Sequence, residues 1–123
     1  TPTPYYYGEM TWPQIKEAAA QGRVAVVPVA TIEDHGLHLP IDTDVRLCYA
    51  ACDGAVALVP DKAVLVPPVN HGYSPHHMDF PGAITIGWET FIRYMLDVCK
   101  SLVAHGFHRI LIVNGHGSNT PFV

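Results

Sequence analysis

Carboxylate and imidazole side chains gather in two stretches of this sequence, each directly after an apolar segment of strand length. Glu33, His35 and Asp44 lie in the first stretch, and His116 lies between two glycines in the second. In an extended backbone Glu33 and His35 point to the same side, and Gly36 permits the sharp turn that returns the chain toward Asp44. These groups are suitable ligands for Zn²⁺, Mn²⁺ or Fe²⁺. The pattern therefore predicts a site for a divalent cation.

Each of these residues also has a simpler interpretation when it is taken alone. Asp44 and Thr43 could cap the helix that follows them, and His38 or His105 could be ordinary hydrogen-bonded histidines. The complete set is harder to explain in this way, because its members follow two strands of one predicted sheet, where ligands of open α/β sheets bind. Three other histidines are expected to be surface or loop residues: His71, His76 and His108.

The elements that must position these groups alternate between helical and strand patterns. Three apolar runs predict buried strands at residues 24–30, 63–66 and 109–113. Helical periodicity predicts helices at residues 12–21, 44–58 and 88–105, and residues 119–121 resemble the first turn of another helix. Parallel strands need such crossover connections, so the sequence predicts an α/β fold with a parallel sheet.

A three-stranded parallel sheet is a poor stopping point for a fold, because both faces and at least one edge need cover. We therefore expect residues 1–123 to be the N-terminal part of a single α/β domain, with the remainder in another chain or missing. The sequence contains no internal repeat that would suggest a different organisation.

The composition excludes several classes of partner. The 123 residues are 49% hydrophobic and 15% charged, as in globular proteins, and the formal net charge is −4. The seven Lys and Arg residues are not clustered, so we expect no nucleic acid and no membrane as a partner. There is neither a long apolar run nor a signal-peptide pattern. Cys48, Cys52 and Cys99 are expected to be free thiols, which favours a reducing, cytoplasmic location.

Three linked motifs resemble the creatininase (creatinine amidohydrolase) family in order and spacing. They are Glu33-Asp-His35-Gly-Leu-His38-Leu-Pro40 with Thr43-Asp44, then His77-Met-Asp-Phe80-Pro-Gly82, then Asn114-Gly-His116-Gly-Ser-Asn119. The resemblance extends over nearly the whole chain from Trp12. It implies a three-layer α/β/α fold with a mostly parallel sheet, in a larger protein that is usually a homo-oligomer.

The resemblance also implies a binuclear metal centre. Residues that match Glu33, His35, Asp44 and His116 bind two divalent ions in this family, with the aspartate as the bridge. One ion would be bound by Glu33, Asp44 and His116, and the other by His35 and Asp44. This sequence departs from creatininase itself at Ser118, where that enzyme has a metal-binding glutamate, so the second ion lacks an anionic ligand from this loop.

Further site residues come from the same resemblance. Tyr73, Ser74, Gly117 and Ser118 are expected to line the substrate pocket, with Ser74 matching a serine that contacts substrate. His77 is expected either to take part in catalysis, as a proton shuttle or as a support for a metal ligand, or to anchor the loop in which it lies.

The predicted function is that of a metal-dependent amidohydrolase, in which a metal-activated water cleaves an amide C–N bond of a small or cyclic amide. Formamides and short peptides are other substrates within the family's range. No nucleophilic triad competes, because Ser118 is not in a Gly-x-Ser-x-Gly turn. The alternative is a non-catalytic metal-binding or assembly subunit. In either case the C-terminal half of the same precursor, present as a separate chain, is an expected partner.

Overall fold

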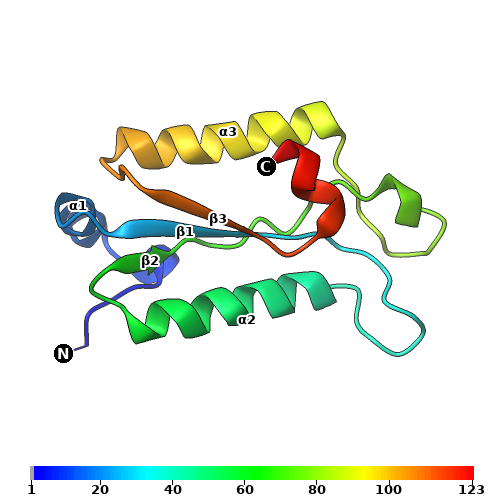
Figure 1. The fold of residues 1–123 in the computed structure, drawn as a ribbon, viewed down its shortest axis with the longest axis horizontal. Coiled ribbons are helices and arrows are strands. Elements are labelled where there is room, and N and C mark those ends of the chain that lie inside the picture. Colours follow the sequence, from blue (N-terminus) through cyan, green and yellow to red (C-terminus); the bar gives the residue numbers. More distant parts are fainter. Residues whose placement is uncertain (1) are drawn as a thin grey trace.

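The computed structural model describes residues 2–123 and places three strands in one layer between two long helices (Figure 1). The helices and strands are α1 (Trp12–Ala20), β1 (Val24–Val29), α2 (Thr43–Leu58), β2 (Ala63–Leu65), α3 (Trp88–Ala104) and β3 (Ile110–Asn114). Three short 3₁₀ helices accompany them: η1 (Tyr7–Glu9), η2 (Pro75–His77) and η3 (Gly117–Phe122). The predicted three-layer α/β fold is confirmed.

The sheet is parallel, with strand order β2-β1-β3. Its central strand pairs with both neighbours, for example Val26 with Leu65 and Val27 with Ile112. Because helices cover both faces, side chains on either side of β1 are buried, and this explains its continuous apolar sequence.

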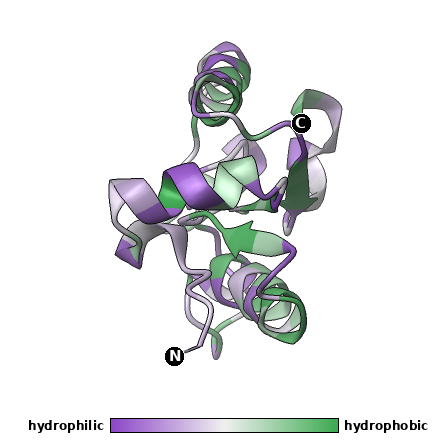
Figure 2. Ribbon diagram, turned by 90° about the vertical axis from the view of Figure 1, so that its left-hand side faces the viewer, coloured by the Kyte–Doolittle hydropathy of each residue, from purple (hydrophilic) through white to green (hydrophobic). Residues whose placement is uncertain are grey.

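Each long helix covers one face of the sheet (Figure 2). Phe91, Met95 and Leu102 of α3 pack into a core with Val27 and Val29 of β1. On the other face α2 contributes a second core. Its buried side chains are Cys48, Cys52 and Val56. Burial of a large apolar side chain such as Phe91 or Val56 contributes roughly 1.5–3 kcal/mol to folding, so these contacts fix both helices on the sheet. None of the helices in residues 2–123 is both long and apolar enough to cross a membrane.

The two edges of the sheet differ. At the β2 edge the N-terminal segment adds a parallel bridge between Tyr6 and Leu65, and the Leu65 amide donates to the Tyr5 carbonyl at 2.7 Å. At the β3 edge the side chain of Leu111 remains 52% exposed. The chain therefore leaves β3 as its open, partly apolar edge.

The element ends agree with the sequence signals except at the last helix. The backbone N–H of Thr11 donates to Oε1 of Gln14 at 2.8 Å, as a capping box requires. Gly106 follows α3 with φ +99°, so the predicted glycine stop is confirmed. A helix was predicted to begin at residues 119–121, but the helix there is of the 3₁₀ type and begins two residues earlier, at Gly117. The amide of Asn119 donates to the His116 carbonyl.

Candidate metal centre

The loop between β1 and α2 positions two carboxylates of the site. The amide of Glu33 donates to the carbonyl of Ile41 at 3.0 Å, and this bond closes the loop at its base. Gly36, inside the loop, has φ +65°, a conformation that suits glycine. The closed loop leads directly into α2, and Asp44 lies in the first turn of that helix. Residues 33 and 44 are thereby brought together at the carboxyl end of β1.

The four predicted metal ligands converge there. Nε2 of His35 lies 2.9 Å from Oδ1 of Asp44 and 3.8 Å from Oε1 of Glu33. Nδ1 of His116 lies 3.3 Å from Oε1 of Glu33 and 3.3 Å from Oδ2 of Asp44. Glu33, His35 and Asp44 offer ligand atoms that all lie within 4.8 Å of one another. Two imidazoles and two carboxylates from three elements therefore face one small volume.

The position of His116 depends on a glycine and on a carbonyl. A Cβ on Gly115 would lie 2.6 Å from Cβ of Cys48, so only glycine lets this loop approach α2 so closely. Nε2 of His116 lies 3.1 Å from the carbonyl oxygen of Tyr73 and donates its N–H there. This bond leaves Nδ1 on the side of Glu33 and Asp44, the usual arrangement of a metal-binding histidine.

The electrostatics of the site favour a cation. Burial raises the pKa of Glu33, and the neighbouring Asp44 raises it further, whereas His116 and His77 oppose the shift. Oε2 of Glu33 and Oδ2 of Asp44 are buried without a hydrogen-bond partner. The nearest imidazole nitrogens are within ion-pair distance of these oxygens but not aligned as hydrogen-bond donors. Unpaired buried carboxylate oxygens are costly, and a divalent ion would satisfy them.

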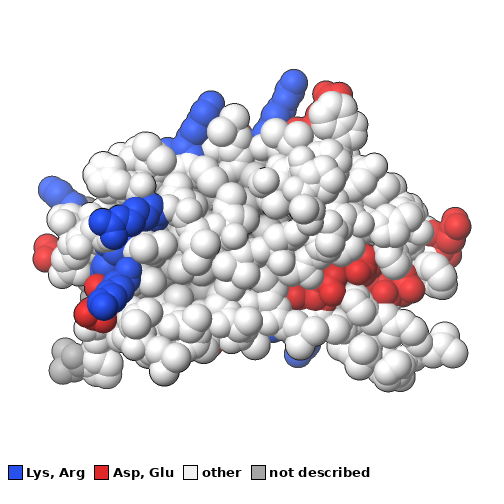
Figure 3. Space-filling view, in the orientation of Figure 1, with Lys and Arg blue, Asp and Glu red and all other residues white. Residues whose placement is uncertain are grey.

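The surface charge agrees with this geometry. The largest group of acidic atoms visible in Figure 3 lies toward the end of the molecule that contains the carboxyl ends of the strands. Most Lys and Arg atoms on the same face lie elsewhere. The field at this end therefore attracts cations.

His77 lies on η2 and uses both ring nitrogens inside the site. Nδ1 lies 2.6 Å from Oδ1 of Asp34, and Nε2 lies 3.1 Å from Oε2 of Glu33. Sequence reasoning missed Asp34, because alternation along an extended strand predicts that its side chain points away from Glu33 and His35. The contact between Asp34 and His77 joins residues 43 positions apart in sequence, so no local sequence pattern predicts it.

The four predicted pocket residues have different surroundings. Ser74 is fully buried, its Oγ lies 2.8 Å from Oγ1 of Thr31, and its amide donates to Oγ1 of Thr85. This disagrees with the expectation that Ser74 lines the pocket, because its hydroxyl fixes the loop instead.

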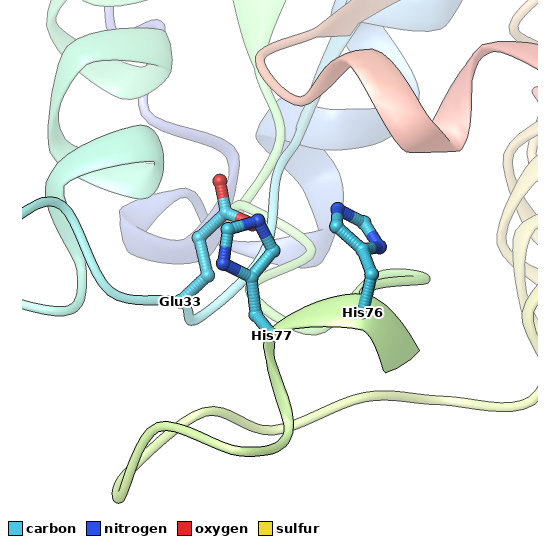
Figure 4. A group of neighbouring side chains, drawn as sticks. All are labelled: Glu33, His76 and His77. Atoms are coloured by element: carbon cyan, nitrogen blue, oxygen red, sulfur yellow. The ribbon is translucent and has the colours of Figure 1, made fainter.

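The other three remain accessible in part. Tyr73 is half-buried with its ring edge-on to Phe122, Gly117 is exposed, and Oγ of the half-buried Ser118 lies 3.4 Å from Nε2 of His76. His76 was expected on the surface and is exposed, but it lies at the rim of the site (Figure 4). The other histidines outside the site are also exposed: His38, His71, His105 and His108.

Asn119 joins three of the segments that carry the site. This fully buried side chain accepts a bond from the amide of Tyr73 at 2.9 Å and donates to the carbonyl of Ala30 at 3.2 Å. It also donates to Oδ1 of Asn114 at 3.3 Å, which in turn accepts the amide of His116. Its place in the Asn-Gly-His motif was visible in the sequence, but its partners were not.

The fold and the site together define an α/β protein with a candidate divalent-metal centre at the carboxyl ends of its strands. The chain belongs to the creatininase family, because the family model described as creatinine amidohydrolase matches residues 8–123.

Individual relatives agree with this assignment. Creatinine amidohydrolase of Pseudomonas putida is 29% identical over 96% of this chain and 47% of its own length. Mycofactocin precursor peptide peptidase of Mycolicibacterium smegmatis is 38% identical over 78% of this chain and 40% of its own. A solved structure described as creatininase Mn superposes with a TM-score of 0.90 at 30% identity, covering 97% of this chain and 48% of that one. A mutant creatininase of the Zn-Zn type gives a TM-score of 0.89 at 29% identity, covering 98% and 48%. The chain thus spans about half the length of its relatives.

Proposed function

We propose that this chain carries the metal centre of an amidohydrolase that cleaves the C–N bond of a small or cyclic amide. One observation carries the proposal: Glu33, His35, Asp44 and His116 converge with two buried carboxylate oxygens unpaired. When bound there, a divalent ion would lower the pKa of a water ligand toward about 7 and polarise the amide carbonyl. The relatives whose names describe hydrolysis support the same class of reaction.

The protein's own residues would hold and orient the centre. Asp44 has one carboxylate oxygen toward His35 and the other toward His116, so it is placed to join two ions. The backbone carbonyl of Tyr73 fixes the ring of His116. His77 touches the Glu33 carboxylate and is bonded to Asp34, a pair through which a proton could leave the site. We therefore keep His77 as a candidate catalytic residue and Tyr73, Gly117 and Ser118 as candidate pocket residues.

Two ions of Zn²⁺, Mn²⁺ or Fe²⁺ are the proposed cofactors. The Zn-Zn type and Mn creatininase structures support this choice for the family fold. A small or cyclic amide is favoured as substrate because creatinine amidohydrolase matches nearly the whole chain. The three free cysteines are consistent with a reducing, cytoplasmic location.

The test is amide hydrolysis before and after chelation. A panel of cyclic amides, formamides and short peptides would be assayed with the metal-loaded protein, after treatment with a chelator, and after restoration of Zn²⁺ or Mn²⁺. We expect activity toward cyclic amides to disappear with the metal and to return with it. Activity that is indifferent to the chelator would contradict the proposal.

The second half of the domain is the proposed partner. The exposed Leu111 of β3 and the half-length match to relatives support a second half of the domain that packs against this side of the sheet. We propose that it is held as a separate chain, within a homo-oligomer. Mass spectrometry of purified protein under denaturing conditions would test this. A second polypeptide with creatininase-family sequence is the expected result. Folded, metal-free protein containing only residues 1–123 would instead favour a non-catalytic assembly subunit.

A further inference from the structure

The ring of His77 contacts the side chains of two consecutive acidic residues. Its Nδ1 lies 2.6 Å from Oδ1 of Asp34, and its Nε2 lies 3.1 Å from Oε2 of Glu33. An ionised carboxylate only accepts hydrogen bonds, so the short contact with Asp34 places the proton of His77 on Nδ1. The ring therefore has its second nitrogen, Nε2, on the side of the metal centre.

His77 lies between the buried part of the site and solvent. The side chain of Glu33 is 8% exposed, whereas that of His77 is 26% exposed. Figure 4 shows the ring of His77 beside the Glu33 carboxylate. An imidazole in this place can bind a polar group of a substrate, or move a proton between the metal centre and the outside. Either role depends on which nitrogen of the ring is on the side of the site.

The backbone around this histidine is anchored by contacts that do not involve its aspartate partner. Before η2, Oγ of Ser74 lies 2.8 Å from Oγ1 of Thr31. After η2, the amide of Ile84 donates to the carbonyl of Ile32 at 3.0 Å. These bonds fix the segment on both sides of η2 against the chain that follows β1. The contact with Asp34 is therefore left to set the orientation of the imidazole ring rather than the position of its backbone.

We propose that Asp34 is a positioning residue, which holds the ring of His77 by Nδ1 so that His77 acts in the reaction through Nε2. This inference rests on the proposed function, and it leaves the two ions joined by Asp44 as proposed there. A carboxylate that accepts from one imidazole nitrogen fixes the tautomer and the orientation of the ring. An asparagine at position 34 would keep the size of the side chain, but its amide group can donate as well as accept. The ring would then no longer be restricted to one tautomer.

Long-range ¹H–¹⁵N correlation spectra of the Zn²⁺-loaded protein test the contact itself. In the wild type, Nδ1 of His77 should carry a proton. In Asp34→Asn the ring should lose this preference, and its signals should shift toward a mixture of the two tautomers. Asp79→Asn changes an exposed aspartate two residues after His77, so it is the matched control and should leave the signals of His77 unchanged. An unprotonated Nδ1 in the wild type, or unchanged signals of His77 in Asp34→Asn, would overturn the inference.

Kinetics on the amide that the wild type hydrolyses fastest test the role of the contact. Asp34→Asn should lower kcat at least about tenfold and change KM by less than about twofold, because the ring stays in place with the wrong tautomer. In a His77→Gln background Asp34→Asn should have no further effect, because a positioning residue acts only through the ring that it holds.

The outcomes separate this inference from the proposed function. An unchanged kcat in Asp34→Asn, an equal loss in Asp79→Asn, or a further loss in the double variant would overturn the role of Asp34 and leave the metal-dependent function intact. If the wild type hydrolyses no amide of the panel, the proposed function fails, and the role of Asp34 in it fails as well.

Discussion

The Nε2 atom of His116 lies 3.1 Å from the carbonyl oxygen of Tyr73, although 43 residues separate them in sequence. A carbonyl oxygen only accepts hydrogen bonds, so the contact requires a proton on Nε2. The other nitrogen, Nδ1, faces the carboxylates of Glu33 and Asp44 and is the ring atom left to bind a cation there. The backbone around Tyr73 thus selects the form of His116 that can bind a cation.

This relationship predicts the tautomer of His116. In the Zn²⁺-loaded protein, long-range ¹H–¹⁵N correlation spectra should show His116 with its proton on Nε2 and none on Nδ1. Exposed His108 lies outside the site and serves as the control, because its spectrum should not change when Zn²⁺ is added. A proton on Nδ1 of His116 in the loaded protein would mean that this ring does not bind the ion.

Removal of the metal should lower the stability of the protein. A ligand that binds only the folded state at 100 times its Kd adds about 2.7 kcal/mol, so urea unfolding with and without Zn²⁺ should differ by about this amount. Asp44→Asn should lose most of this gain. Asp97→Asn, which changes an exposed aspartate on α3, is the matched control and should keep it. Equal gains in both variants would remove Asp44 from the site.

Sequence could predict the features of this fold that depend on local pattern. The apolar run of β1 predicted a buried strand, and Gly36 with the spacing from Glu33 to Asp44 predicted a loop that returns to its start. Asp34 and His76 could not be assigned, because their positions depend on how η2 docks against the loop after β1.

Ser74 was expected in the pocket but is buried, and this too could not be predicted from local sequence. Its burial depends on contacts with Thr31 and Ile84, which come from other segments. Residue type and spacing identify groups that can do chemistry. The side of the backbone on which a loop side chain lies is decided by long-range packing.

Gly115→Ala should disrupt the approach of the His116 loop to α2. The added Cβ would lie 2.6 Å from Cβ of Cys48 and 3.1 Å from its Sγ. Such overpacking typically costs about 1–3 kcal/mol, and the displaced loop should also bind Zn²⁺ more weakly. Gly54→Ala is the matched control: it lies within α2 with no atom close to the new Cβ, and should stabilise the helix by about 1 kcal/mol. Similar unfolding free energies for the two variants would contradict the close approach.

The thiol of Cys52 should be unreactive in the folded protein. Burial, with a further contribution from Cys48, raises the pKa of Cys52 to about 11. The neutral thiol is therefore favoured, and at pH 8 roughly one Cys52 in a thousand is the reactive thiolate. Iodoacetamide at pH 8 should modify Cys52 slowly in native protein and rapidly in urea, as followed by peptide mass spectrometry. Equal rates would show that α2 does not bury this side chain.

The same shift predicts a loss of stability at high pH. The unfolded state releases the Cys52 proton near pH 9, whereas the folded state retains it until about pH 11. The folded state therefore binds more protons within this window, and the contribution of Cys52 to stability falls as pH rises from 9 to 11. Cys52→Ala should show a shallower fall in unfolding free energy over this range.

Asn119→Ala should destabilise the protein and weaken metal binding together. The substitution leaves the Tyr73 amide and the Ala30 carbonyl without their partner inside the protein. Each unsatisfied buried group costs about 1–3 kcal/mol, so we expect a loss of about 2 kcal/mol or more in the unfolding free energy of metal-free protein. Zn²⁺ affinity should fall as well, because the Tyr73 carbonyl no longer holds the ring of His116 in place. Asn70→Ala removes an exposed asparagine and should change stability by less than about 0.5 kcal/mol, with Zn²⁺ affinity unchanged. Loss of stability in Asn119→Ala without loss of Zn²⁺ affinity would mean that the Tyr73 carbonyl does not position His116.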